Sequence, residues 1–141
     1  MKGFTLLELL IVIAAAILIT ALTIPVGVRF FQTQILDETR AGILETLRSA
    51  QNQAMFQKND SAFGVKFLSG SYVLFQGSSY GEVPSEDENF TLSSGITTSG
   101  IDEVVFAKLT GIPNPSGTLT ITSGNDSQAL NINTQGKIER Q

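Results

Sequence analysis

The chain begins with a long apolar stretch that one carboxylate interrupts. Apart from Glu8, the residues from Phe4 to Val28 form an apolar run. A run of this length exceeds the roughly 20 residues that a helix needs to cross the hydrocarbon layer of a bilayer. Its Leu, Ile, Val and Phe residues each favour insertion by about 0.3–0.6 kcal/mol, and together they outweigh the cost of one carboxylate. The pattern therefore predicts a membrane-spanning helix over residues 4–28.

A second pattern continues the helix beyond this run. Apolar residues recur at spacings of three and four, which is typical of an amphipathic helix. The stripe consists of Phe31, Ile35, Thr39, Ile43, Leu47, Ala50 and Ala54. We therefore expect one helix from about Phe4 to Gln57, with its second half packed against a folded domain. Pro25 removes a backbone hydrogen bond and Gly27 lowers helix propensity, which predicts either a simple kink or a stretch that can melt near residues 23–27.

The pattern changes to alternation after Asn59-Asp60, where the helix is expected to end. Two alternating segments, Ala62–Leu68 and Tyr72–Gln76, flank Ser69-Gly70 and predict a β-hairpin. A loop rich in Ser and Gly follows. Shorter strands are then expected at residues 90–92, 103–108, 118–122 and 128–133, and a last one at Ile138. One helix followed by β-meanders predicts an α+β fold in which an antiparallel sheet packs on the helix.

Glu8 is the residue in the apolar run that most needs an explanation. A carboxylate at the centre of a membrane span costs about 2.5–3.5 kcal/mol, and less near the ends of the span. A charge inside such a segment therefore indicates a functional site with a partner. Lys2 precedes the run and predicts that the N-terminus lies in the cytoplasm, with the domain across the membrane. Two simpler interpretations, a secretory signal peptide and a plain single-pass anchor, do not account for Glu8.

The N-terminal residues Gly3-Phe4-Thr5-Leu6-Leu7-Glu8, with the apolar residues after them, resemble the signature of type IV pilins and type II secretion pseudopilins. The resemblance implies that a membrane-embedded prepilin peptidase cuts between Gly3 and Phe4 and methylates the new N-terminus. It also implies storage in the inner membrane and assembly into a filament, in which the Phe4 amine of one subunit pairs with Glu8 of a neighbour. Pro25 falls where that family commonly carries a helix-interrupting proline.

Elementary electrostatics supports this pairing independently of the resemblance. Cleavage would create a cationic amine one helical turn from Glu8, and each charge is costly in hydrocarbon unless it is paired. The contact could lie within one chain or between neighbours. A single buried polar contact can also fix the register of an assembly.

The second half of the chain is similar to the H-type minor pseudopilins and related minor pilins. The likeness rests on a long helix leading into two small sheets and on the ending Gln135-Gly136-Lys137-Ile138-Glu139-Arg140. Some minor pilins of this group bind DNA through a Gly-Arg-x-Arg ending, which makes Lys137 and Arg140 candidate phosphate contacts. Because a Glu intervenes and the net charge is −4, nucleic acid is a disfavoured partner and a surface β-turn is the preferred interpretation.

The composition restricts the chemistry that this chain can perform. It has no Cys and no His, which removes thiol chemistry and the most common general base. Carboxylates alone carry no reaction signature, so we expect no catalytic residues and no enzymatic activity. The acidic residues Glu82, Glu86, Asp87 and Glu88 match no calcium-ligand spacing and predict a solvated loop. We therefore expect neither a metal nor a cofactor.

Together these observations predict a structural subunit of a type IV pilus or type II secretion pseudopilus. Residues 1–3 would be the leader, 4–28 the membrane and filament-core helix, and 29–141 a globular domain on the periplasmic or extracellular side. Its partners would be other pilin or pseudopilin subunits, prepilin peptidase, the inner-membrane assembly platform and, before assembly, membrane lipid. Two alternatives stay open: a minor subunit that initiates or caps the filament, with a DNA- or surface-binding role, and a membrane protein unrelated to filaments.

Overall fold

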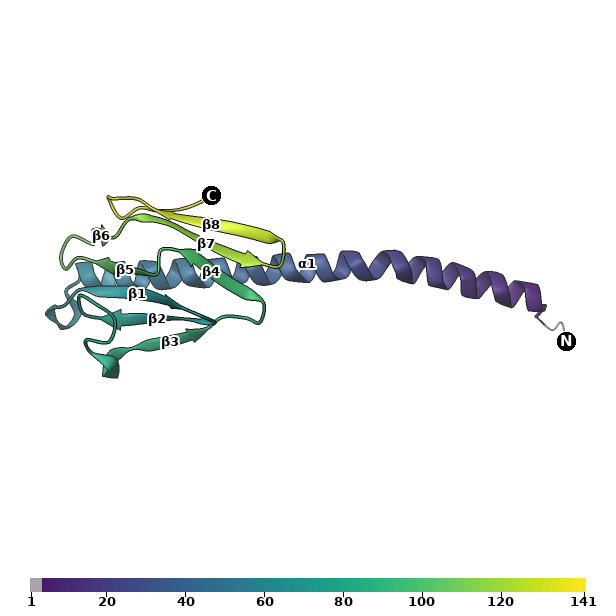
Figure 1. The fold of residues 1–141 in the computed structure, drawn as a ribbon, viewed down its shortest axis with the longest axis horizontal. Helices are drawn as coiled ribbons and strands as arrows, with labels where there is room; N and C mark the ends of the chain where they lie inside the picture. Colours follow the sequence, from purple (N-terminus) through teal and green to yellow (C-terminus); the bar gives the residue numbers. More distant parts are fainter. Residues whose placement is uncertain (1–3) are drawn as a thin grey trace. The chain divides into compact units, whose positions relative to one another are not determined.

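A computed structural model describes residues 4–141 of the chain, with only the backbone described at residues 22–26. The chain divides into two compact units, Met1–Gln34 and Ile35–Gln141, which are described separately below. One helix, α1, spans Leu6–Met55 and contributes to both units (Figure 1). The leader predicted at residues 1–3, including Gly3, lies outside the described residues.

The single long helix is confirmed, although α1 ends at Met55 instead of Gln57. Gln57 adopts a left-handed conformation with φ 55°, which stops the helix, and the Leu109 N–H donates to the Ala54 carbonyl at 3.0 Å. The predicted end at Asn59-Asp60 belongs to a short 3-10 turn, η1 (Lys58–Asp60). The backbone is helical through residues 23–27. The side chain of Pro25 lies outside the described part, so a kink there stays a prediction.

The second unit contains two antiparallel sheets, which confirms the α+β class (Figure 1). The first sheet has the strand order β3-β2-β1-β5-β6 and the second has the order β4-β7-β8-β9. The strands are β1 (Phe63–Leu68), β2 (Ser71–Gln76), β3 (Glu88–Thr91), β4 (Ile96–Gly100), β5 (Glu103–Phe106), β6 (Pro113–Asn114), β7 (Gly117–Ser123), β8 (Asp126–Ile132) and β9 (Ile138–Arg140). The hairpin predicted around Ser69-Gly70 is the β1–β2 pair, in which Leu68 faces Ser71.

Two strands, β4 and β6, were not predicted from the sequence. In β4 only Ile96 is fully buried, so the segment shows no apolar alternation. Its strand geometry comes instead from pairing with β7, where Gly100 lies opposite Leu119. An added Cβ at Gly100 would collide with the Thr118 carbonyl oxygen, so glycine at this position allows β4 and β7 to lie close together. β6 is a two-residue pairing with β5 and is too short to carry a pattern.

The core of the second unit lies where the C-terminal part of α1 meets both sheets. Its helical members are Leu36, Ile43, Leu44, Leu47, Ala50 and Ala54, and they join buried residues of β1, β2, β5, β7 and β8. The predicted stripe is correct from Ile43 onward, whereas Phe31 is 63% exposed and Thr39 is only half-buried. Two sheets cover a wider helix face than one sheet would, which brings Leu36 and Leu44 into the core. Each fully buried Leu or Ile contributes about 1.5–3 kcal/mol.

The outer face of the first sheet is covered as well. Val73 and Phe75 of β2 are both fully buried there, and the Tyr80 ring packs edge-on against Phe75 at 5.9 Å between centroids. The loop after β2, predicted as solvated, therefore folds back over the sheet through its aromatic residue. It continues into a 3-10 turn, η2 (Pro84–Glu86).

Candidate functional site

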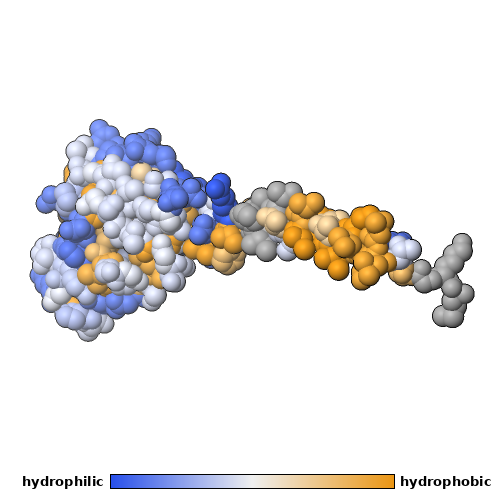
Figure 2. Space-filling view, turned by 45° about the vertical axis from the view of Figure 1, so that its right-hand side comes forward, coloured by the Kyte–Doolittle hydropathy of each residue, from blue (hydrophilic) through white to orange (hydrophobic). Residues whose placement is uncertain are grey.

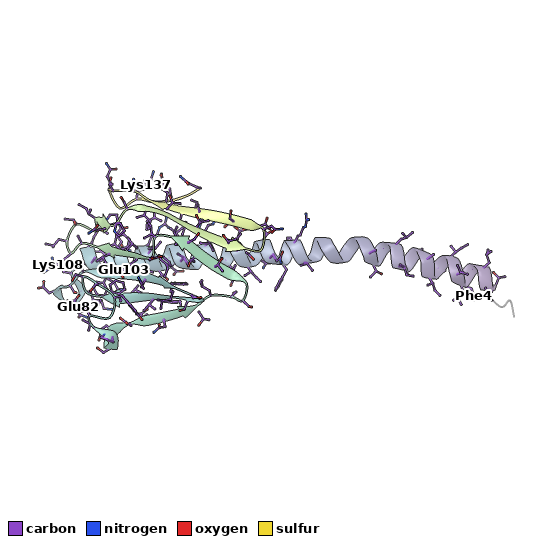
Figure 3. The ribbon with its side chains drawn as sticks, viewed as in Figure 1. Phe4, Glu82, Glu103, Lys108 and Lys137 are labelled. Atoms are coloured by element: carbon purple, nitrogen blue, oxygen red, sulfur yellow. The ribbon has the colours of Figure 1, made fainter. Side chains whose placement is uncertain are left out.

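The N-terminal end of α1 places the residues of the predicted processing and assembly signature. Thr5 precedes the helix, and its Oγ1 accepts a hydrogen bond from the Glu8 N–H at 3.3 Å, which is the geometry of an N-cap. Glu8 lies in the first helical turn, where the helix dipole favours a carboxylate. Phe4 is 83% exposed at the start of the described chain (Figure 3). Glu8 thus has a local stabilising role beside the predicted pairing with an amine.

The helical part of the first unit exposes apolar side chains at consecutive positions, which spread around the helix; Figure 2 shows them on the face turned to the viewer. The exposed set is Leu6, Leu7, Leu9, Leu10, Ile11, Val12, Ile13, Ile17, Leu18 and Ile19. At about 1.5–3 kcal/mol for each side chain, leaving such a set in water costs on the order of 15–30 kcal/mol. A helix that is apolar all round is normally buried in an apolar environment. This segment therefore favours an apolar environment over water.

The described side chains stop at residue 21 and resume at residue 27. Among them, no helix has both the length and the apolarity that a membrane crossing needs.

The acidic loop after β2 is organised by its own hydrogen bonds. The Glu82 carboxylate accepts from the Ser78 backbone N–H at 2.6 Å and from the Ser78 hydroxyl at 3.1 Å. These bonds hold the pKa of Glu82 below its usual range. Glu82 and Glu103, which is 3.5 Å from the Lys66 ammonium, are labelled in Figure 3. Over residues 4–141, no three metal-ligating side chains are gathered in one place.

The C-terminal turn that resembles the minor-pilin ending is hydrogen-bonded to α1. The Asn133 side-chain oxygen accepts from the Lys137 N–H at 2.8 Å and closes the turn between β8 and β9. The amide of Gln51 on α1 donates to the Gly136 carbonyl at 2.9 Å and to the Gly111 carbonyl at 3.0 Å. Gly136 has φ 85°, and a side chain there would press on the Gly111 carbonyl. One helical amide therefore binds a turn from each sheet.

The two candidate phosphate contacts do not face the same way. Lys137 precedes β9 (Ile138–Arg140), and within the strand Glu139 and Arg140 point to opposite faces because side chains alternate. Lys137, which is labelled in Figure 3, forms an ion pair with Glu139. Arg140 instead lines a groove of 680 Å³ beside α1, together with Arg48 and Phe56. The structure therefore gives these two cations different surroundings.

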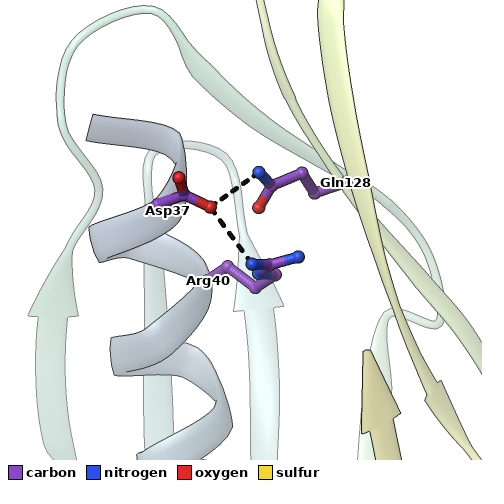
Figure 4. A network of polar contacts seen from close by, with 3 residues as sticks. All are labelled: Asp37, Arg40 and Gln128. Carbon is purple, nitrogen blue, oxygen red and sulfur yellow. Dashed lines mark hydrogen bonds and ion pairs between the residues drawn. The ribbon is translucent and has the colours of Figure 1, made fainter. Parts of the chain in front are cut away.

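A polar network joins α1 to the second sheet (Figure 4). One carboxylate oxygen of Asp37 accepts from the Arg40 guanidinium at 3.1 Å and from the Gln128 amide at 2.8 Å. Arg40 and Asp37 are 17% and 52% exposed at their side chains, so the ion pair itself adds little stability. The hydrogen bond from Gln128 has a larger structural role, because Gln128 belongs to β8 and the bond links that strand to α1.

Gln51 and Gln128 were both missed by sequence reasoning. A single Gln on a helix or strand gives no periodic signal, because its position in the pattern is also open to solvated residues. Only the neighbouring Ala50 and Ala54 indicated that the helix surface near Gln51 is closely covered. The partners of Gln51 are carbonyl groups of turns 60 and 85 residues away, which no local pattern contains.

Comparison with known proteins gives one informative result. No family model matches the chain, and no curated protein matches it. Among solved structures, it is similar to the minor pseudopilin EpsH from the Type 2 Secretion System of Vibrio cholerae. The TM-score is 0.56 at 11% sequence identity, and the match covers 75% of this chain and 95% of that chain. The chain therefore has the pseudopilin fold, as the resemblance of its second half implied.

Proposed function

We propose that this chain is a structural subunit of a type II secretion pseudopilus or a related type IV pilus-like filament. The observation that carries the proposal is a helical segment that is apolar on all its sides, joined to a unit with the pseudopilin fold. Such a segment needs an apolar environment both before and after assembly. Lipid would supply it in the stored state, and the helices of neighbouring subunits would supply it in the filament.

The membrane and processing steps belong to the same proposal. Residues 4–28 would span the inner membrane with the N-terminus in the cytoplasm, and the second unit would lie on the far side. Prepilin peptidase would cut between Gly3 and Phe4 and methylate Phe4. The assembly platform would then draw the processed chain into the filament. The N-cap on Thr5 fits a processed chain that starts at Phe4, because the capping group lies after the proposed cleavage site.

The position in the filament is the finer question. The similar solved structure is a minor pseudopilin, which supports a minor subunit over a major one. A minor subunit would initiate or cap the filament and would be present in few copies. DNA binding is not part of the proposal, because Lys137 is paired with Glu139 while Arg140 lines the groove beside α1.

The test of the proposal is the N-terminus of the native protein. Intact-mass and N-terminal analysis of chains from the host should show a start at Phe4, with N-methylation. Gly3→Val should leave residues 1–3 attached, because a peptidase subsite shaped for glycine would reject the larger side chain. A matched control is Lys2→Arg, which should be processed as the original chain. A native chain that starts at Met1, or one cut beyond Ala21, would contradict the proposal.

A further inference from the structure

The exposed apolar side chains of the second unit gather at one end of it. Within residues 35–141, five large apolar side chains are exposed, and four of them lie at or beside the C-terminal end of α1. These four, which we call the end patch, are Met55, Phe56, Leu109 and Ile112. Phe56 is 82% exposed, whereas the fifth side chain, Tyr80, packs on Phe75. An exposed apolar cluster of this kind indicates a contact surface.

The end patch is continuous because the loop between β5 and β6 lies against the end of the helix (Figure 1). The Leu109 N–H donates to the Ala54 carbonyl at 3.0 Å, and a Cβ added to Gly111 would meet the Met55 side chain at 2.8 Å. The two remaining members of the end patch follow Met55 and Gly111 directly in the chain. Residues from α1 and from the loop therefore form one surface.

Cations surround the end patch. They are Arg48, Lys58, Lys108 and Arg140, of which Lys108 is labelled in Figure 3. The two arginines line the groove of 680 Å³ with Phe56, and within residues 4–141 neither guanidinium has a hydrogen-bond or ion-pair partner. The lysines are engaged, Lys108 with Asp60 and Lys58 with Gln53. Counting Glu45 in the groove, this end carries four cations against two carboxylates, in a chain whose net charge is −4.

The size of the end patch favours lipid over a protein partner. Its four partly exposed side chains offer on the order of a few hundred Å², whereas a standard protein interface buries roughly 800 Å² on each partner. A lipid surface needs no such area and no complementary shape, because apolar side chains enter it while Lys and Arg stay at the phosphates. Nucleic acid would use the cations alone and would leave Phe56 and Leu109 in water.

We propose that the end patch and its cations bind the surface of a bilayer that contains anionic phospholipid. Phe56, Leu109 and Ile112 enter the boundary between headgroups and acyl chains, and Arg48 and Arg140 contact the phosphate groups. Each cation near such a surface raises the affinity about fivefold, and the effect fades as salt increases. The contact therefore depends on apolar side chains and on charge together.

This contact is distinct from the apolar segment of the first unit. Ile35 begins the second unit, and Met55 lies 20 residues further along α1, which corresponds to roughly 30 Å of helix. The end patch is thus at the far end of that helical stretch within the second unit. The inference goes beyond the proposed function, because it requires neither processing at Phe4 nor assembly into a filament.

The test uses the full-length chain in nanodiscs of phosphatidylcholine, to which separate vesicles are added. Because the chain has no Cys, Thr110→Cys provides one attachment point for an environment-sensitive fluorophore in the loop of the end patch. Vesicles of phosphatidylcholine and phosphatidylglycerol in equal parts should shift its emission to shorter wavelength and should sediment with the protein. Vesicles of phosphatidylcholine alone should bind at least about tenfold more weakly, and added salt should reduce this difference.

Two sets of substitutions separate the apolar contribution from the charged one. The variants Phe56→Ser/Leu109→Ser/Ile112→Ser and Arg48→Gln/Lys58→Gln/Arg140→Gln should each lower the vesicle affinity at least about tenfold. All six side chains are exposed, so the melting temperature of the second unit should change little. The matched controls, Phe56→Leu/Leu109→Met/Ile112→Val and Arg48→Lys/Arg140→Lys, keep the apolar or cationic character and should bind as the original chain does.

A second labelling position controls for non-specific adsorption. Ser94→Cys carries the same fluorophore at an exposed position between β3 and β4, and its emission should not respond to the vesicles. The inference is overturned if anionic vesicles leave the label at position 110 unchanged, if both labels respond equally, or if either triple variant binds like the original chain. An emission shift that appears without vesicles and grows with protein concentration also overturns it, because a second copy would then cover the end patch.

These outcomes are independent of the proposed function. That function is tested by the N-terminus at Phe4, which the vesicle experiment does not measure. A native chain that starts at Met1 would remove the proposed function and leave the bilayer contact standing. Loss of vesicle binding would have the opposite effect, so the two claims fail separately.

Discussion

The two halves of α1 use the same secondary structure for opposite purposes. In the first unit, residues such as Ile17 and Leu18 are more than 60% exposed, and apolar side chains surround the helix. In the second unit, Ile43 and Leu47 are fully buried, and the opposite side of the helix is polar. The period of the apolar pattern therefore decides how a helix buries its apolar side chains. An apolar stripe can be buried against the rest of its own chain, but a helix that is apolar on all sides cannot be fully buried in this way.

The sharpest test of this comparison is the same substitution in each half of the helix. Ile43→Asp places an unpaired carboxylate in a fully buried site, and we expect a loss of more than about 4 kcal/mol in the free energy of unfolding. Ile17→Asp adds a charge to the exposed apolar segment and should leave the second unit folded. Limited proteolysis and thermal melting of the full chain in detergent measure both outcomes.

Each of the two variants has a conservative control at the same position. Ile43→Leu should melt close to the original chain, because it keeps apolar volume in the core. Ile17→Leu should enter membranes and filaments normally. If Ile43→Asp melts like Ile17→Asp, the assignment of the buried helix face is wrong and the contrast between the halves disappears.

Glu8 provides the next test, because it is a charge in the half that is otherwise apolar. Glu8→Ala should leave processing and melting of the second unit unchanged, while the amount found in sheared filaments falls by about tenfold, equivalent to 1.4 kcal/mol. The physical reason is the loss of a partner for the Phe4 amine of a neighbour. In a minor subunit, co-purification with neighbouring subunits replaces the filament fraction as the measurement.

A local role for Glu8 gives a different result. A carboxylate that only favours the helix dipole is worth about 0.3–1 kcal/mol, which would shift helix stability and spare assembly. Normal incorporation of the Ala variant would support that simpler role. Glu8→Asp is the matched control, since it keeps the charge on a shorter side chain.

Gln51 tests how the second half of the helix is joined to its sheets. Gln51→Ala removes both amide hydrogen bonds and leaves the Gly111 and Gly136 carbonyls without this donor. We expect a loss of about 1–3 kcal/mol, measured by denaturant unfolding. Asn52→Ala, at the exposed neighbouring position, is the control and should change stability by less than about 0.5 kcal/mol. Equal effects of the two changes would contradict the role of Gln51.

The smallest expected effect concerns Glu82, in the loop that covers the first sheet. Its lowered pKa means that the carboxylate stabilises the loop above its usual pKa range. This stabilisation is lost as the pH falls through the folded pKa. Hydrogen exchange at the Ser78 amide should therefore accelerate on acidification, after correction for the intrinsic rate, and Glu82→Gln should remove this pH dependence. A corrected rate that does not change with pH would contradict the assignment.

The sequence predicted the fold well wherever local patterns decide the structure. The period of three and four between Ile43 and Ala54 gave the buried helix face, and alternation on either side of Ser69-Gly70 gave the hairpin. The sequence did not predict segments whose structure depends on pairing with a distant strand. β4 has one fully buried residue and becomes a strand because β7 lies beside it. Leu36 and Leu44 lie beside the predicted stripe and are buried because two sheets cover the helix.

The candidate site divides in the same way. The signature around Phe4 and Glu8 is contiguous, so it can be identified from the sequence alone. The groove of 680 Å³ beside α1 cannot be found in this way, because Arg48 and Arg140 lie in different elements and only the fold makes them neighbours. Arg140 was named from the sequence as a second candidate phosphate contact beside Lys137, but Lys137 pairs with Glu139 and Arg140 lines the groove. Contacts between distant segments are therefore the part that local patterns cannot supply.

The bonds of Gln51 have a consequence for how the second unit unfolds. Gly111 belongs to the loop after β5 of the first sheet, and Gly136 belongs to the turn before β9 of the second. The chain has no Cys and so no disulfides, and the Gln51 amide and the shared core both help to hold the two sheets on the helix. Neither sheet can detach without exposing the helix face that the other still needs. Loss of tertiary structure should therefore be cooperative, with both sheets disappearing in one transition and no half-folded species accumulating.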